Sequence, residues 1–166
     1  MWKPLDHWRF SEKCGVFGFV GEGLHVEDGI SGLKALEHRG NGPAGFVSRS
    51  SKGKFSTYHS PVMEQLAAPA GITESAAFVG HNRYATSAST SMENTQPFLL
   101  RQGKFSLALA HNGNLPEANV QKLRVLLQKA LSATASDSAV LAQVLIEQRA
   151  RYASWQETFL NTLTLV

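Results

Sequence analysis

The order of the apolar segments is the feature of this sequence that most limits its fold. Short runs with strand-like alternation occupy the first two thirds of the 166 residues, and helical patterns dominate the last third. The expected strands are 15–20, 45–50, 54–60, 76–86 and 105–115, and the expected helices are 30–40, 117–131, 137–150 and one from 154. Residues 51–53 suit a hairpin between the second and third strands. Strands joined by hairpins and flanked by helices predict a single α+β layered domain.

Capping residues indicate where several of these helices begin and end. Gly40 stands where a helix C-terminal cap belongs, and Pro116 suits the first position of the following helix. Ser154 and Glu157 have the spacing of a capping box. The polar stretch 87–97 has no periodicity and predicts a loop.

Composition and charge exclude several classes of protein. The chain is 43% hydrophobic and 17% charged, with a net charge of +3 and no basic run. The scattered positive charges give little support for a nucleic acid as a partner. No apolar window approaches the ~18 residues of a membrane-spanning helix, so no membrane is expected as a partner either. The chain has one cysteine, and residues 1–13 lack the apolar core of a signal peptide. These two features predict a cytoplasmic protein.

Four segments place polar or reactive side chains at the ends of expected strands or at the start of a helix. They are Cys14, GHNRYAT, AHNGN and the pair SD at 136–137. Each has an ordinary structural interpretation when taken alone. A single cysteine is more often buried than catalytic, His81 and His111 could be satisfied core histidines, and Asp137 suits a helix N-cap.

Taken together, the segments resemble the glutamine-hydrolysing domain of the class II glutamine amidotransferases, and within them the amidophosphoribosyltransferases of purine synthesis. The motifs that carry the resemblance are CGVFG (14–18), LEHRG (36–40), GHNRYAT (80–86), QPF (96–98), LALAHNGNL (107–115) and SDS (136–138). The resemblance implies an enzyme with the four-layer αββα N-terminal nucleophile hydrolase fold. Residues 14–166 would form the amidotransferase domain, truncated at its C-terminal end and lacking the phosphoribosyltransferase domain.

The resemblance also assigns catalytic roles. Cys14 would be the nucleophile and its own α-amine the base, so residues 1–13 would be a leader that is removed. Asn112 and Gly113 would form the oxyanion hole, where glycine permits close approach and unusual dihedral angles. Arg39 would lie beside the nucleophile, where a positive charge favours the thiolate.

Three further residues would hold the substrate. Arg83 matches an arginine that grips the α-carboxylate of glutamine, a task that suits its planar guanidinium. Thr86 would assist through its hydroxyl, and Asp137 would pair with the substrate ammonium. The polar segment 85–94 corresponds to the family's loop that closes over glutamine.

The implied partners are glutamine and, through the absent domain, phosphoribosyl pyrophosphate. No cofactor is expected in this chain, and Mg²⁺ is expected with the phosphoribosyltransferase domain. The full-length protein is expected to be a homo-oligomer.

Two alternatives remain at this point. The domain could be a catalytically silent remnant or regulatory module that keeps its leader. Zinc could also be held by Cys14, His38, His81 and His111, although their spacing matches no common ligand pattern.

Overall fold

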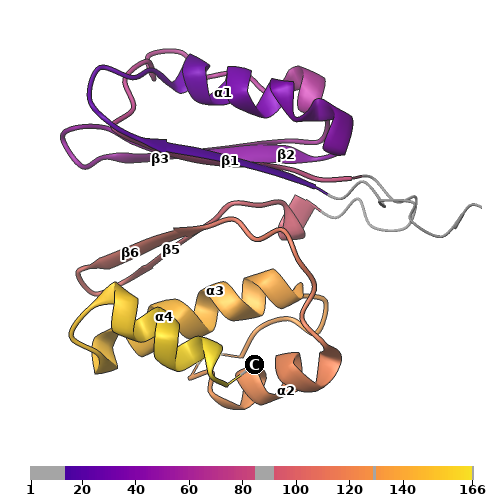
Figure 1. The fold of residues 1–166 in the computed structure, drawn as a ribbon, viewed down its shortest axis with the longest axis vertical. Helices are drawn as coiled ribbons and strands as arrows, with labels where there is room; N and C mark the ends of the chain where they lie inside the picture. The colour runs from indigo at the N-terminus through magenta and orange to yellow at the C-terminus, as the bar shows by residue number, and fades with distance from the viewer. Residues whose placement is uncertain (1–13, 85–91, 129, 166) are drawn as a thin grey trace, which may run out of the picture.

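A computed structural model describes residues 14–84, 92–128 and 130–165, and its elements stack in four layers (Figure 1). Helix α1 (Val26–Ala35) forms the first layer, a four-stranded sheet the second, and a two-stranded sheet the third. The fourth layer consists of helices α2 (Glu117–Val125), α3 (Asp137–Gln148) and α4 (Trp155–Leu163). This is the αββα arrangement that the sequence led us to expect.

The larger sheet is antiparallel, with the strand order β1-β4-β2-β3. Its strands are β1 (Gly15–Val20), β2 (Ala44–Arg49), β3 (Phe55–Ser60) and β4 (Ala77–Asn82). The pairing of β1 with β4 sets Gly15 opposite Asn82. Cys14 precedes the first of these residues and Arg83 follows the second, so both lie at the same end of the sheet.

Helix α1 (Val26–Ala35) covers one face of this sheet. Its buried side chains recur at helical spacing at Val26, Ile30 and Leu33. They pack with Phe46 and Phe78, which project from neighbouring strands. This cluster fixes β4, and therefore the position of Arg83 at its end.

Gly40 does not cap α1, contrary to the sequence prediction. The helix ends at Ala35 and its C-cap is Leu36, whose N–H donates to the Leu33 carbonyl, and a 3-10 turn, η1 (Glu37–Arg39), follows. Gly40 has an extended backbone with φ of −177°. A Cβ at this position would lie 2.6 Å from the Arg83 carbonyl carbon. Gly40 therefore allows close approach of the chain that carries Arg83.

The smaller sheet pairs β5 (Phe98–Gln102) with β6 (Phe105–Leu109) around a turn in which Gly103 has φ of 56°. Strand β6 was predicted and β5 was not. The sequence FLLRQ of β5 is short and lacks clear alternation, so its strand conformation depends on pairing with β6.

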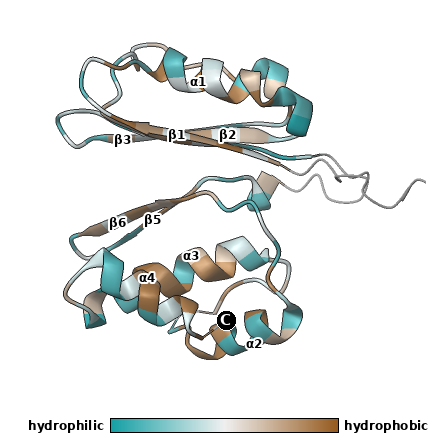
Figure 2. Cartoon of the chain, in the orientation of Figure 1, coloured by the Kyte–Doolittle hydropathy of each residue, from teal (hydrophilic) through white to brown (hydrophobic). Residues whose placement is uncertain are grey.

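The helical layer comprises α2 (Glu117–Val125), α3 (Asp137–Gln148) and α4 (Trp155–Leu163). Helix α3 lies between the hairpin and the other two helices, and its residues are largely apolar (Figure 2). The expected capping residue of α4 is confirmed, because the Ser154 hydroxyl accepts from the Glu157 N–H. The remaining 3-10 turns are η2 (Met63–Gln65), η3 (Met92–Asn94) and η4 (Arg149–Arg151).

Helix α2 is shorter than predicted, ending at Val125 rather than residue 131. The Gln128 N–H donates to the buried Glu147 carboxylate, and the Arg124 guanidinium donates to the carbonyls of Ser132 and Ala135. These tertiary bonds turn the chain away from the helix axis.

None of the helices in the described residues has the length and continuous apolar surface needed to cross a bilayer.

Candidate active site

One small cavity brings together residues from five segments of the chain. It has a volume of about 190 Å³ and is lined by Cys14, Arg83, Gly113 and Asp137. The other lining residues are His81, Asn94, Gln96, His111, Asn114, Ser136 and Ser138. Four of the seven predicted site residues therefore meet at one place.

The backbone of Cys14 is held by two of the remaining predicted residues. Its carbonyl accepts a hydrogen bond from Arg39 Nε at 3.1 Å and another from Asn112 Nδ2 at 2.8 Å. Asn112 does not line the cavity, and one of its two amide hydrogens is used in this bond. Arg39 and Asn112 thus fix the residue that would carry the nucleophile.

Gly113 lies close to the ring of His111. A Cβ on Gly113 would lie 2.5 Å from His111 Nε2. The φ of Gly113 is not among the positive values found for glycines in the described residues. The ring of His111 is oriented by Ser138 Oγ, 2.9 Å from its Nδ1.

Asp137 is the first residue of α3 and not its N-cap, contrary to its simple structural interpretation. Ser136 is the N-cap, with its hydroxyl accepting from the Ala139 N–H at 3.2 Å. The Asp137 carboxylate accepts from the N–H groups of Leu115 and Ser138 at 2.8 and 2.7 Å. These bonds hold a negatively charged group at the cavity wall.

Arg83 is placed by its backbone. Its N–H donates to the Pro43 carbonyl and its own carbonyl accepts from the Gly42 N–H, both at 2.9 Å. Of the seven predicted site residues, Thr86 lies outside the described residues, as do 85–91 of the predicted substrate loop.

His81 is a cavity residue to which the family resemblance assigned no role. It is 2% exposed, yet neither ring nitrogen has a hydrogen-bond partner within the described structure. Burial, with smaller contributions from the charges of Arg83 and His111, lowers the pKa of His81 to about 4. His81 is therefore a buried neutral imidazole that is not satisfied by the core, contrary to its simple structural interpretation.

This burial predicts a pH dependence of stability. In the unfolded chain His81 binds a proton near pH 6.5, whereas in the folded protein it does so only near pH 4. The contribution of neutral His81 to the free energy of unfolding is complete above pH 6.5. It is lost as the pH falls toward 4, because the unfolded chain then takes up a proton that the folded protein does not. We expect His81→Leu to reduce the fall in unfolding free energy between pH 6.5 and 4.5 by about 2 kcal/mol, measured by urea denaturation. The exposed His38→Leu is the control, and equal acid sensitivity of His81→Leu and the parent protein would contradict this prediction.

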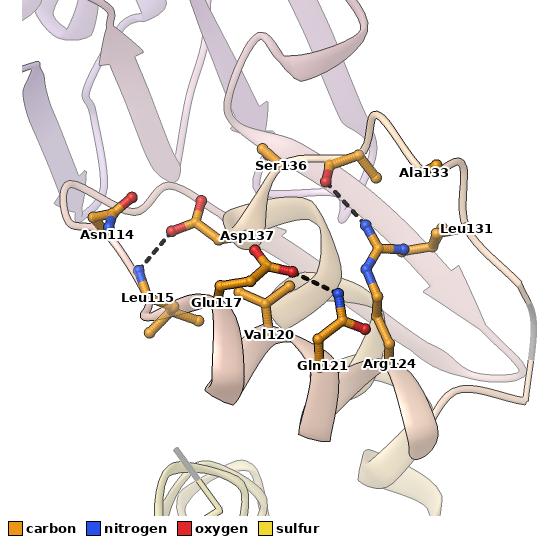
Figure 3. A pocket seen from close by; sticks show the side chains of 11 residues that line it. Asn114, Leu115, Glu117, Val120, Gln121, Arg124, Leu131, Ala133, Ser136 and Asp137 are labelled. Carbon is orange, nitrogen blue, oxygen red and sulfur yellow. Dashed lines mark hydrogen bonds between the residues drawn. The ribbon is translucent and has the colours of Figure 1, made fainter.

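A larger cavity, about 570 Å³, adjoins the first and shares Asn114, Ser136 and Asp137 with it (Figure 3). Its polar side chains are largely bonded to other protein groups. Glu117 accepts from Gln121, and Arg124 donates to backbone carbonyls. Asp137 lines both cavities.

Among the described residues, no group of three or more His, Cys, Asp or Glu side chains is placed to hold a metal ion.

Comparisons with known proteins identify the family to which this chain belongs. The sequence pattern of the family "Glutamine amidotransferases class-II" matches residues 38–164. The amidophosphoribosyltransferase of Lacticaseibacillus casei is 34% identical over 152 residues, which cover 87% of this chain and 76% of that protein. The corresponding Bacillus subtilis protein is 32% identical over 94% of this chain.

The match to solved structures extends to the fold. The structure of the B. subtilis glutamine phosphoribosylpyrophosphate amidotransferase, complexed with ADP and GMP, has a TM-score of 0.73 and 32% identity over 90% of this chain. This chain spans about a third of the length of the first curated relatives that it matches. The N-terminal nucleophile hydrolase fold expected from the sequence is thereby confirmed. The chain belongs to the class-II glutamine amidotransferases and is homologous to the amidophosphoribosyltransferases.

Proposed function

We propose that residues 14–166 bind glutamine and hydrolyse its side-chain amide to glutamate and ammonia. The observation that carries this proposal is the convergence of Cys14, Arg83, Gly113 and Asp137 on one cavity. Its volume of about 190 Å³ is below the roughly 300–1,000 Å³ of sites for drug-sized ligands, which favours a ligand the size of an amino acid.

In the proposed reaction, Cys14 Sγ attacks the side-chain carbonyl carbon of glutamine. The thiol proton passes to the Cys14 α-amine and then to the departing nitrogen, so that ammonia leaves and a thioester forms. Water then hydrolyses the thioester to glutamate. A free α-amine titrates near ~8 and a thiol near ~8.5, so proton exchange between them is nearly thermoneutral. This chemistry requires removal of residues 1–13.

The charges at the cavity suit the two charged groups on the α-carbon of glutamine. Arg83 would bind the α-carboxylate and Asp137 would bind the α-ammonium. Thr86 would add a hydroxyl contact. Gly113 N–H and the second N–H of the Asn112 side chain would stabilise the oxyanion.

The ammonia would serve the synthesis of phosphoribosylamine from phosphoribosyl pyrophosphate. The relatives' name supports this part of the proposal, and the acceptor site would lie in a phosphoribosyltransferase domain outside residues 14–166. Mg²⁺ would be bound there, and the whole protein would act as a cytoplasmic homo-oligomer.

The test is the formation of glutamate from glutamine by protein whose first residue is Cys14, with Asn112→Ala as the variant. We expect kcat to fall about 100- to 1,000-fold with little change in KM, because the lost amide acts mainly on the transition state. Asn161→Ala removes an exposed amide on α4 and is the control. The absence of glutamate formation by the parent protein, or an unchanged kcat in Asn112→Ala, would overturn the respective assignment.

A further inference from the structure

The motif QPF contributes to the family resemblance without a chemical role. Its first residue, Gln96, lines the cavity beside His111. Gln96 is 8% exposed. Its Oε1 accepts from the His111 N–H at 2.6 Å, and its Nε2 donates to the His111 carbonyl at 3.2 Å. One side-chain amide therefore satisfies both backbone groups of His111.

This pair continues the hairpin register. The last paired residues of the ladder are Phe98 and Leu109, and Gln96 and His111 stand two residues further along each strand. A carboxamide has the same donor and acceptor as a peptide group. The Gln96 side chain thus takes the place of a backbone partner and extends the ladder to the residue before Asn112 and Gly113.

Asn94 makes a similar contact with the segment that leads into α3. Its Nδ2 donates to the Thr134 carbonyl at 3.0 Å, and its Oδ1 accepts from the Ser136 N–H at 2.8 Å. Ser136 is the N-cap of α3, and Asp137 is the first residue of that helix. Asn94 therefore fixes the start of the helix that presents Asp137 to the cavity.

We propose that Asn94 and Gln96 are positioning residues with separate targets. Gln96 sets the position of the oxyanion donors through His111, and Asn94 sets the position of Asp137 through Ser136. The proposal rests on the proposed function, since it assigns Gln96 to stabilisation of the transition state of glutamine hydrolysis and Asn94 to binding of the substrate. A displaced oxyanion donor weakens the transition state, whereas a displaced Asp137 weakens binding of the substrate itself.

The experiment compares Gln96→Met with Asn94→Leu, each of which removes two hydrogen bonds while keeping a side chain of similar length. For Gln96→Met we expect kcat to fall about 10- to 100-fold with KM within about twofold. For Asn94→Leu we expect KM to rise about 10-fold with kcat within about threefold. Asn161→Ala is the control, because its side-chain amide also bonds to a backbone carbonyl but lies on exposed α4. A fall in kcat in both variants, or a rise in KM in both variants, would overturn the separate assignments.

A second readout does not require turnover. Hydrogen exchange measured by NMR should show the His111 amide exchanging roughly 10-fold faster in Gln96→Met and the Ser136 amide roughly 10-fold faster in Asn94→Leu. Each amide should be unaffected by the other substitution. Unchanged exchange of both amides would overturn the positioning roles even in an active protein. If the exchange pattern is found but the parent protein forms no glutamate, the positioning contacts stand and the proposed function fails.

Discussion

Replacement of Cys14 by alanine is expected to lower kcat for glutamine hydrolysis by roughly 10⁴-fold or more, because the variant lacks the thiol that attacks the substrate. Among the residues lining the cavity, Cys14 is the one that carries a thiol. The measurement is glutamate formation under steady-state conditions, with parent and variant proteins that both begin at residue 14.

The alanine variant should still bind glutamine. Arg83 and Asp137 remain in place, and the Arg39 and Asn112 side chains contact the backbone carbonyl of residue 14 rather than its side chain. Titration calorimetry should therefore give a Kd within a fewfold of the parent value for the same substrate. Loss of binding together with activity would indicate a disturbed fold instead of a missing nucleophile.

Cys14→Ser offers a more stringent comparison, since serine keeps a hydroxyl at the same position. A hydroxyl is far less acidic than a thiol, so the serine variant should also be strongly impaired. Hydrolysis at an unchanged rate by the serine variant would exclude Cys14 as the nucleophile.

Local patterns were sufficient to predict most of the fold. The strands around Gly15–Val20 and Phe105–Leu109 have clear apolar periodicity, and α3 begins where SDS indicated a helix start. By contrast, β5 acquires its structure from β6, and α2 is shortened by bonds to residues distant in the sequence. Interactions of this kind leave no local pattern, which explains why these two elements were missed or misjudged.

The same distinction separates the predicted site residues from those that were missed. Cys14, Arg83 and Asp137 were identified because the motifs that contain them resemble those of a known family. Gln96 and Asn94 contact backbone atoms 15 and 42 residues away, and a side-chain amide in a polar segment gives no sign of such a partner. Their role could be recognised only once the hairpin register and the start of α3 were placed together.

Retention of residues 1–13 is expected to reduce glutamine hydrolysis by about 10²- to 10⁴-fold, the usual contribution of a general base. When Lys13 is attached, the Cys14 nitrogen is part of a peptide bond and cannot accept the thiol proton. The test compares intact protein with protein cleaved after Lys13, each verified by intact mass and assayed for glutamate.

A matched variant separates the role of the amine from the mere presence of extra residues. Protein that begins with Gly-Cys14 adds one residue and leaves a free amine one position too far from the thiol. It should be impaired like the protein with the complete leader, because the base is then attached to the wrong residue. If the Gly-Cys14 protein or the uncleaved protein is as active as protein beginning at Cys14, the α-amine is not the base. The proton must then go to another group at the cavity, and the imidazoles of His81 and His111 are the candidates that line it.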